Sequence, residues 1–169
     1  FDTTSVSISN MLLILYRQPG LKAKLMADRD LLPAAINEFL RFQPASPSAA
    51  RYAAKDVEIG GAKVKAGDTL MVSWAAANRD PEAFPRPTEI DLDRPATPAP
   101  IPFGTGMRTC LGKHLAQMEL RILLDVWLSR IPEYDIQADA IVPSERRANA
   151  GTYLSMPVTF PARPRLAAG

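Results

Sequence analysis

Apolar residues recur at helical spacing in the first part of the chain. In the first segment they are Val6, Met11, Leu12 and Leu15. This spacing predicts a helix that ends at Pro19-Gly20, followed by a short helix over 21–28. A third helix is expected over 33–42, because a proline suits its first position and Pro44 closes it.

Alternation replaces helical spacing between residues 51 and 74. This stretch, RYAAKDVEIGGAKVKAGDTLMVSW, has turn signals at Gly60-Gly61 and Ala66-Gly67, which predicts strands and a hairpin. Prolines are frequent from residue 78 to residue 102, and they exclude a long helix or a central strand there. Because Phe84, Ile90 and Leu92 are spaced through this segment as if fixed to a core, we expect an ordered coil.

The strongest helical pattern of the chain comes next. Its amphipathic stripe consists of Leu111, Leu115, Met118, Ile122 and Val126 and lasts to about Trp127. The tail from Tyr134 to Phe160 contains strand-like pieces between turns. Together these patterns predict a mainly α-helical chain with a smaller β-sheet component, an α+β fold, over residues 1–169.

Composition and charge narrow the functional classes. A chain of 169 residues with 47% hydrophobic and 22% charged residues is ordinary for a globular protein. The net charge of +2 gives no reason to expect nucleic acid or an anionic membrane as a partner. The longest apolar stretches, MLLIL and MVSWAAA, are too short for a membrane span. Since the chain opens directly in helical periodicity, without an initiator methionine or a signal-peptide layout, we expect it to be part of a longer protein.

The single cysteine, Cys110, lies in the segment PFGTGMRTCLGKHLAQ, just before the strongest predicted helix. The N-terminal end of a helix favours an anion. Gly104 and Gly106 leave the backbone unshielded, and Arg108 adds a permanent cation. Such surroundings lower the pKa of a thiol from about 8.5 toward or below neutrality. We therefore expect a thiolate at this position.

Several chemistries can be tested against this segment. A phosphate-binding loop fails, because five residues separate Gly106 from Gly112 and His114 replaces the hydroxyl residue that would bind magnesium. The dinucleotide-binding pattern fails because Thr109 replaces its last glycine. A structural zinc site needs four ligands, and Cys110 with His114 supplies two. A Cys110–His114 nucleophile pair stays open, as does a thiolate that binds iron.

Residues 103–112, FGTGMRTCLG, resemble the haem-binding signature of the cytochrome P450 family, F-x-x-G-x-[RH]-x-C-x-G, at every fixed position. The resemblance implies haem b as the cofactor and Cys110 as its metal ligand, a thiolate that pushes electron density onto the iron. It places Phe103 beside the sulfur and pairs Arg108 with a haem propionate. It also implies that the backbone at Gly104 and Gly112 approaches the macrocycle.

Other motifs of the same family are matched in order. Glu38-Phe39-Leu40-Arg41 resembles its E-x-x-R motif, and Arg94 matches its second arginine. The resemblance implies a buried Glu38–Arg41–Arg94 network, while an exposed i, i+3 ion pair is the plain alternative. Arg51 stands where the family has a strand arginine that holds a propionate, a role that suits a guanidinium fork. A solvent-facing strand residue is the alternative for Arg51.

The start of the chain resembles a further family feature. Asp2-Thr3 matches the acid–alcohol pair that delivers protons during oxygen activation, although alone it is an equally good helix cap. By the same resemblance, the residues expected to face the substrate are Ser46, Ser48, Ala49, Ala50, Thr152 and Tyr153.

The resemblance as a whole implies the C-terminal, haem-ligating portion of a soluble bacterial type of cytochrome P450, without the N-terminal half of the fold. The parent is expected to be a cytoplasmic monooxygenase. It would insert one atom of O₂ into an apolar small-molecule substrate, with electrons from a ferredoxin or a reductase. A non-catalytic haem-binding or structural fragment and a cysteine-nucleophile enzyme stay open. Because such a portion would expose a large apolar patch, we also expect self-association.

Overall fold

The computed structural model describes residues 2–144 and 153–162. Its helices are α1 (Asp2–Arg17), α2 (Pro19–Ala27), α3 (Leu32–Phe42), α4 (Trp74–Ala77) and α5 (Lys113–Arg130), with short 3-10 turns η1 (Arg29–Leu31), η2 (Gly106–Arg108) and η3 (Ala138–Ala140). Its strands are β1 (Ser48–Tyr52), β2 (Val57–Ile59), β3 (Ala62–Val64), β4 (Thr69–Ser73), β5 (Asp135–Ile136), β6 (Val142–Pro143), β7 (Tyr153–Ser155) and β8 (Val158–Thr159). The predicted α+β class, with helices dominant, is confirmed.

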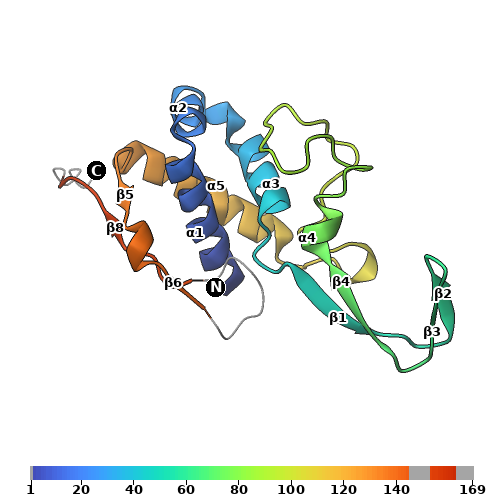
Figure 1. Cartoon of the computed structure of the whole chain (residues 1–169). Helices are drawn as coiled ribbons and strands as arrows, with labels where there is room; N and C mark the ends of the chain where they lie inside the picture. The colour runs from blue at the N-terminus through green and yellow to red at the C-terminus, as the bar shows by residue number, and fades with distance from the viewer. Residues whose placement is uncertain (1, 145–152, 163–169) are drawn as a thin grey trace.

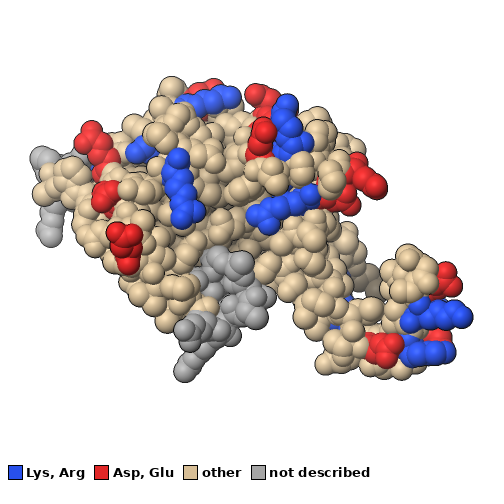
Figure 2. All heavy atoms as spheres, in the orientation of Figure 1, with Lys and Arg blue, Asp and Glu red and all other residues tan. Residues whose placement is uncertain are grey.

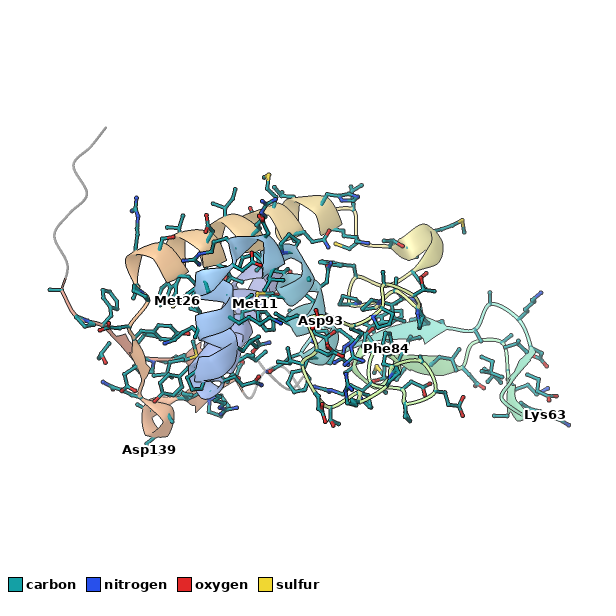
Figure 3. All side chains as sticks on the ribbon, turned by 90° about the horizontal axis from the view of Figure 1, so that it is seen from above. Met11, Met26, Lys63, Phe84, Asp93 and Asp139 are labelled. Atoms are coloured by element: carbon teal, nitrogen blue, oxygen red, sulfur yellow. The ribbon has the colours of Figure 1, made fainter. Side chains whose placement is uncertain are left out.

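The main core lies where α1, α2, α3 and α5 meet (Figure 1). Each helix contributes apolar side chains that are almost completely buried, among them Leu15, Leu25, Phe39 and Leu124. Burial of one such side chain is worth about 1.5–3 kcal/mol relative to exposure. Met11, labelled in Figure 3, is one of the buried residues of this core. No helix within the described ranges is both long and apolar enough to cross a lipid bilayer.

The helices follow the predicted spacing, with one difference at a proline. The sequence predicts that Pro19 ends the first helix, and α1 does end at Arg17. However, Pro19 also begins α2 instead of separating it from α1. The physical reason is that the first position of a helix needs no backbone N–H and suits the fixed φ angle of proline.

The predicted hairpin is confirmed and extends away from the helices. β1 pairs with β4 in antiparallel register, with Arg51 opposite Leu70, and β2 pairs with β3 beyond them. Gly60 and Gly61 have φ angles of 55° and 80°, the left-handed conformation that a tight two-residue turn requires. The hairpin projects from the body of the molecule (Figure 2), and Lys63 lies near its far end (Figure 3).

The proline-rich segment 78–102 is an ordered coil, as predicted. It has neither helix nor strand, yet Phe84 is only 4% exposed. Ile90 and Leu92 are partly buried against the main helical core. The few apolar side chains of this coil therefore hold it against the helices.

The described part of the tail forms a second, smaller core. β5 pairs with β8 and β6 pairs with β7, which agrees with the predicted strand-like pieces. The hydroxyl of Tyr134 donates a hydrogen bond of 2.8 Å to the carbonyl of Leu12 in α1. Burial raises the pKa of Tyr134 well above its usual value. Trp127 packs edge-on against Tyr134 with ring centroids 5.5 Å apart, so α5 and the tail share this core.

The apolar stripe of α5 faces away from the core. Its members Leu115, Met118, Ile122 and Val126 are between 43% and 57% exposed. Leu111, which the sequence pattern assigned to the same stripe, lies before the start of α5 at Lys113 and is fully exposed. The buried side of the same helix carries Leu120, Leu124 and Leu128. Figure 3 shows side chains along the outer edge of α5 pointing away from the other helices. This helix is therefore apolar on two opposite sides, and only one of them is covered by the described residues.

The guanidinium of Arg41 is completely buried and makes a full set of hydrogen bonds. Its Nε and Nη2 donate to the two carboxylate oxygens of Glu38 at 2.8 Å. The remaining N–H groups donate to the backbone carbonyls of Asn78, Pro87 and Glu89 at 2.8–2.9 Å. Since an arginine has five N–H donors, none is left without an acceptor. One side chain of α3 thus fixes the coil at several points.

Arg94 completes the cluster from the coil side. Its Nε donates to Glu38 Oε1 at 2.9 Å, and its side chain is only 7% exposed. The backbone N–H of Asp91 donates to the same oxygen at 3.0 Å. Burial alone would raise the pKa of Glu38, but the hydrogen bonds from Arg41, Asp91 and Arg94 hold that pKa below its usual value. Glu38 is therefore a buried carboxylate, and the exposed ion-pair alternative does not apply.

We expect Glu38→Gln to lower the free energy of unfolding at pH 7 by about 3 kcal/mol, because it leaves buried guanidinium charge unpaired. The pKa of Glu38 is lower in the folded chain than its ordinary value of 4.5. The stabilisation is therefore fully present above about pH 4.5 and is lost as the pH falls through the folded-state pKa. Urea unfolding at several pH values measures both effects, and the gap between wild type and variant should narrow in acid.

Glu89→Gln is the matched control for this prediction. Glu89 forms an i, i+3 pair with Arg86, the same spacing as Glu38 and Arg41, but both side chains are more than 60% exposed. An exposed pair of this kind contributes at most about 1 kcal/mol. Equal losses in the two variants would contradict the importance assigned to the buried cluster.

The second prediction concerns the uncovered apolar side of α5. We expect the chain to self-associate through it. Light scattering across a concentration series should show the 169-residue chain forming oligomers. The double variant Leu115→Glu, Ile122→Glu should shift the chain toward the monomer, because charge on the stripe disfavours apolar contact. A wild-type chain that stays monomeric at high concentration would refute this prediction.

Candidate functional site

A cavity of about 420 Å³ lies beside Cys110. Segments far apart in the sequence form its walls: α1, the end of α3 with the loop that follows, β1, α4, the loop 102–112 and the first turns of α5. The lining residues are Thr3, Thr4, Ser7, Leu40, Ala45, Ser46, Arg51, Trp74, Pro102, Phe103, Gly104, Arg108, Cys110, Gly112, Leu115, Ala116, Glu119 and Leu120.

The loop that carries Cys110 is folded back on itself by backbone hydrogen bonds. The N–H of Cys110 donates to the carbonyl of Phe103 at 2.9 Å, and the N–H of Thr109 donates to Gly106 at 3.1 Å. Gly104 and Gly106 have φ angles of 71° and 68°. Because side chains disfavour this left-handed conformation, these two glycines are required by the path of the loop.

Cys110 is exposed on the cavity and precedes α5. The N-cap of α5 is Gly112, so the cysteine lies two residues before the helix boundary. A Cβ atom on Gly112 would lie 3.9 Å from the sulfur of Cys110, an ordinary contact distance. The sulfur is thus near the N-terminal end of a long helix, where backbone N–H groups and the helix dipole favour negative charge.

Two arginines from different segments of the chain line the cavity. Arg51 comes from β1, and its Nη1 donates to the carbonyl of Ala50 at 2.7 Å. Arg108 comes from η2 in the cysteine loop. The carboxylate residue Glu119 of α5 lines the same cavity. Apart from these charged groups and a few hydroxyls of α1 and the loop after α3, the walls are mainly apolar.

Not every residue predicted from the sequence reaches this cavity. Thr3, Ser46, Arg51 and the predicted residues of the cysteine loop line it. The other predicted residues within the described ranges, which are Asp2, Ser48, Ala49, Ala50 and Tyr153, do not line it. Thr152 lies outside the described residues. The substrate contacts assigned to β1 and the tail remain predictions.

Several lining residues are absent from the sequence-based prediction. Leu115 belongs to the apolar stripe that the sequence reveals, but the pattern does not indicate that it lines a cavity. Trp74 and Glu119 carry no motif in the sequence. Only the packing of β4, α4 and α5 around the cysteine loop brings them to this cavity.

The structure argues against the Cys110–His114 nucleophile pair. That hypothesis rests on helical i, i+4 spacing, but α5 begins at Lys113, so Cys110 is not part of the helix. His114 lines a different hollow of about 440 Å³, together with Lys113, while Cys110 lines the first cavity. The two residues therefore line different hollows.

The buried cluster is connected to the cysteine loop through Asn78. The backbone carbonyl of Asn78 accepts a hydrogen bond from Arg41 at 2.9 Å. Its side-chain oxygen accepts the N–H of Ile101 at 2.7 Å, and the carbonyl of Ile101 accepts the N–H of Gly104 at 3.0 Å. Asn78 itself is completely buried. The start and the end of the proline-rich coil are thus held together immediately before the loop begins.

Comparison with known proteins shows which family the chain resembles. The family model for cytochrome P450 matches residues 1–131. A putative cytochrome P450 126 of Mycobacterium tuberculosis is 42% identical over 129 residues, which cover 76% of this chain and 31% of that protein. The mycinamicin IV hydroxylase/epoxidase of Micromonospora griseorubida is 34% identical over 164 residues, which cover 95% of this chain and 40% of that protein.

Solved structures give the same result. The crystal structure of a cytochrome P450 from Bacillus subtilis, CYP109B1, superposes with a TM-score of 0.86 at 35% sequence identity. The match covers 94% of this chain and 43% of that one, so the chain spans less than half the length of these relatives. The matched motifs, the fold and the sequence similarity together show that this chain belongs to the cytochrome P450 family.

Proposed function

We propose that this chain forms the haem-ligating portion of a haem-thiolate monooxygenase, with Cys110 as the iron ligand. One observation carries the proposal: Arg51 from β1, and Arg108 and Cys110 from the cysteine loop, open into a single cavity. Family membership implies haem as the cofactor, and haem b is the form that we propose.

The residues of the cavity suit a haem in their chemistry. A cysteine thiolate is a known axial ligand of haem iron. The guanidinium groups of Arg51 and Arg108 suit the two propionates, because each can bind a carboxylate through parallel hydrogen bonds. Leu40, Phe103 and Leu115 supply apolar walls for a flat macrocycle.

Each residue then has a proposed task. When bound, the haem supplies the activation of O₂. Cys110 donates electron density to the metal, and the two arginines orient the group through its carboxylates. Thr3 lines the cavity from α1, and we assign its hydroxyl, with Asp2 beside it in the chain, to proton delivery. Phe103, from the same loop as Cys110, lines the cavity, and we assign it the task of limiting access of water.

The activity of the whole protein is part of the same proposal. The parent would oxygenate an apolar small molecule with electrons from a ferredoxin or a reductase, in the cytoplasm. One relative is named as a hydroxylase/epoxidase, and the apolar walls of the cavity fit an apolar substrate. A second candidate is a non-catalytic haem-binding or structural fragment, which is favoured by the uncovered apolar side of α5 and the span of less than half of the relatives.

Spectroscopy of the purified 169-residue chain tests the proposal. After addition of haemin and reduction, carbon monoxide should produce the red-shifted Soret band of thiolate-ligated iron. Cys110→Ala should abolish this band, because the chain contains no other cysteine. Met107→Ala serves as the control, since Met107 lies in the same loop but is fully exposed and does not line the cavity.

A chain that binds no haem, or one whose band survives in Cys110→Ala, would overturn the assignment. A thiolate band without oxygenation of any tested substrate would favour the non-catalytic candidate over the monooxygenase.

A separate prediction concerns the propionate clamps. Arg51→Ala and Arg108→Ala should each weaken haem binding by about tenfold or more, since a hydrogen bond to a charged group contributes about 1.5–3 kcal/mol. Arg121→Ala should leave affinity unchanged, because Arg121 is an exposed residue of α5 that does not line the cavity. Haemin titration followed at the Soret band measures all three, and equal effects of the three variants would contradict the clamp roles.

A further inference from the structure

Trp74 places a large aromatic ring against the cysteine loop. A Cβ atom on Gly104 would lie 3.7 Å from Cζ2 and 4.0 Å from Cη2 of Trp74, so the benzene edge of the indole borders the space that a side chain on Gly104 would occupy. Trp74 also lines the cavity that Cys110 lines. The ring is therefore a neighbour of both the loop and the space beside the sulfur.

The backbone around Trp74 is held from several sides. Trp74 is the first residue of α4, and the hydroxyl of Ser73 caps this turn by accepting the N–H of Ala76 at 3.2 Å. The N–H of Ala75 donates to the carbonyl of Pro47 at 3.0 Å. The carbonyl of Trp74 accepts the N–H of Asn78 at 2.9 Å. The indole therefore projects from a fixed piece of backbone.

The backbone that carries Trp74 is connected through Asn78 to the buried cluster of Glu38, Arg41 and Arg94. Asn78 receives a hydrogen bond from Arg41 and holds Ile101, which in turn binds the N–H of Gly104. Gly104 is thus held through its backbone, and the Trp74 ring lies on the side to which a Cβ of Gly104 would project. Because Gly104 has a φ angle of 71° and no side chain, the ring takes the place of packing that the loop cannot supply itself.

We propose that Trp74 is a positioning residue for the haem thiolate: its indole fixes the Cys110 loop at Gly104 and forms part of the wall that contacts the macrocycle. The inference rests on the proposed haem site. An aromatic ring contributes a large contact area with few rotatable bonds, which suits a rigid wall. The groups that surround a metal ligand orient it and control access of solvent to it.

Two measurements on the reconstituted 169-residue chain test the inference. The first is the rate at which haem is transferred to an excess of apomyoglobin. The second is the fraction of the ferrous–CO complex that shows the red-shifted thiolate band, as opposed to a band at shorter wavelength. Trp74→Ala should lose haem about tenfold faster and show a smaller thiolate fraction, while Trp74→Phe should restore most of both.

Trp127→Phe is the matched control. It changes the second of the two tryptophans, which packs against Tyr134 and does not line the cavity. Its haem-transfer rate and thiolate fraction should equal those of the wild type.

Unchanged values in Trp74→Ala would overturn the inference while leaving the haem site intact. Equal changes in Trp74→Ala and Trp127→Phe would also overturn it, because they would indicate general loss of stability. A wild-type chain without a thiolate band would instead refute the proposed function, and the role of Trp74 with it.

Discussion

The fold depends on the burial of one cation. Arg41 lies inside the protein without any exposed surface, and each of its N–H groups has an acceptor. A buried charge is tolerated only when it is paired and fully hydrogen-bonded. Its acceptors are the carboxylate of Glu38 and three carbonyls from the proline-rich coil. The coil therefore cannot leave its place without removing three hydrogen-bond acceptors from a buried guanidinium.

This constraint explains how a segment without helix or strand can position a reactive loop. Prolines remove backbone donors and prevent regular pairing, so the hydrogen bonds within the coil are local turns and side-chain bonds. Side chains of α3 and the amide of Asn78 supply the missing order and hold Ile101, where the cysteine loop begins. The position of the Cys110 loop is thus connected to α3 through the hydrogen bonds of Arg41, Asn78 and Ile101. The candidate haem site is therefore anchored to the helical core.

The two apolar sides of α5 differ in whether the described residues cover them. Leu120, Leu124 and Leu128 pack into the core, while the opposite stripe is exposed among the described residues. An exposed stripe of this length is typical of a contact surface. The relatives that match this chain are more than twice the length of the matched region. The proposed monooxygenase activity therefore concerns the parent protein, while haem ligation can be tested on the chain itself.

Local signals were sufficient to predict the elements and to single out Cys110 as the proposed ligand. Helical spacing, turn glycines and the signature around Cys110 depend on neighbours in the sequence, and the sequence alone determined them. The sequence also contained Glu38, Arg41 and Arg94 in a recognisable order, but only the structure showed the carbonyls that complete their hydrogen bonds. Tertiary structure alone decided which side of α5 is buried and that the ring of Trp74 lies beside Gly104. The physical reason is that periodicity shows which residues share a face, whereas the identity of the surface packed against that face depends on residues far away in the chain.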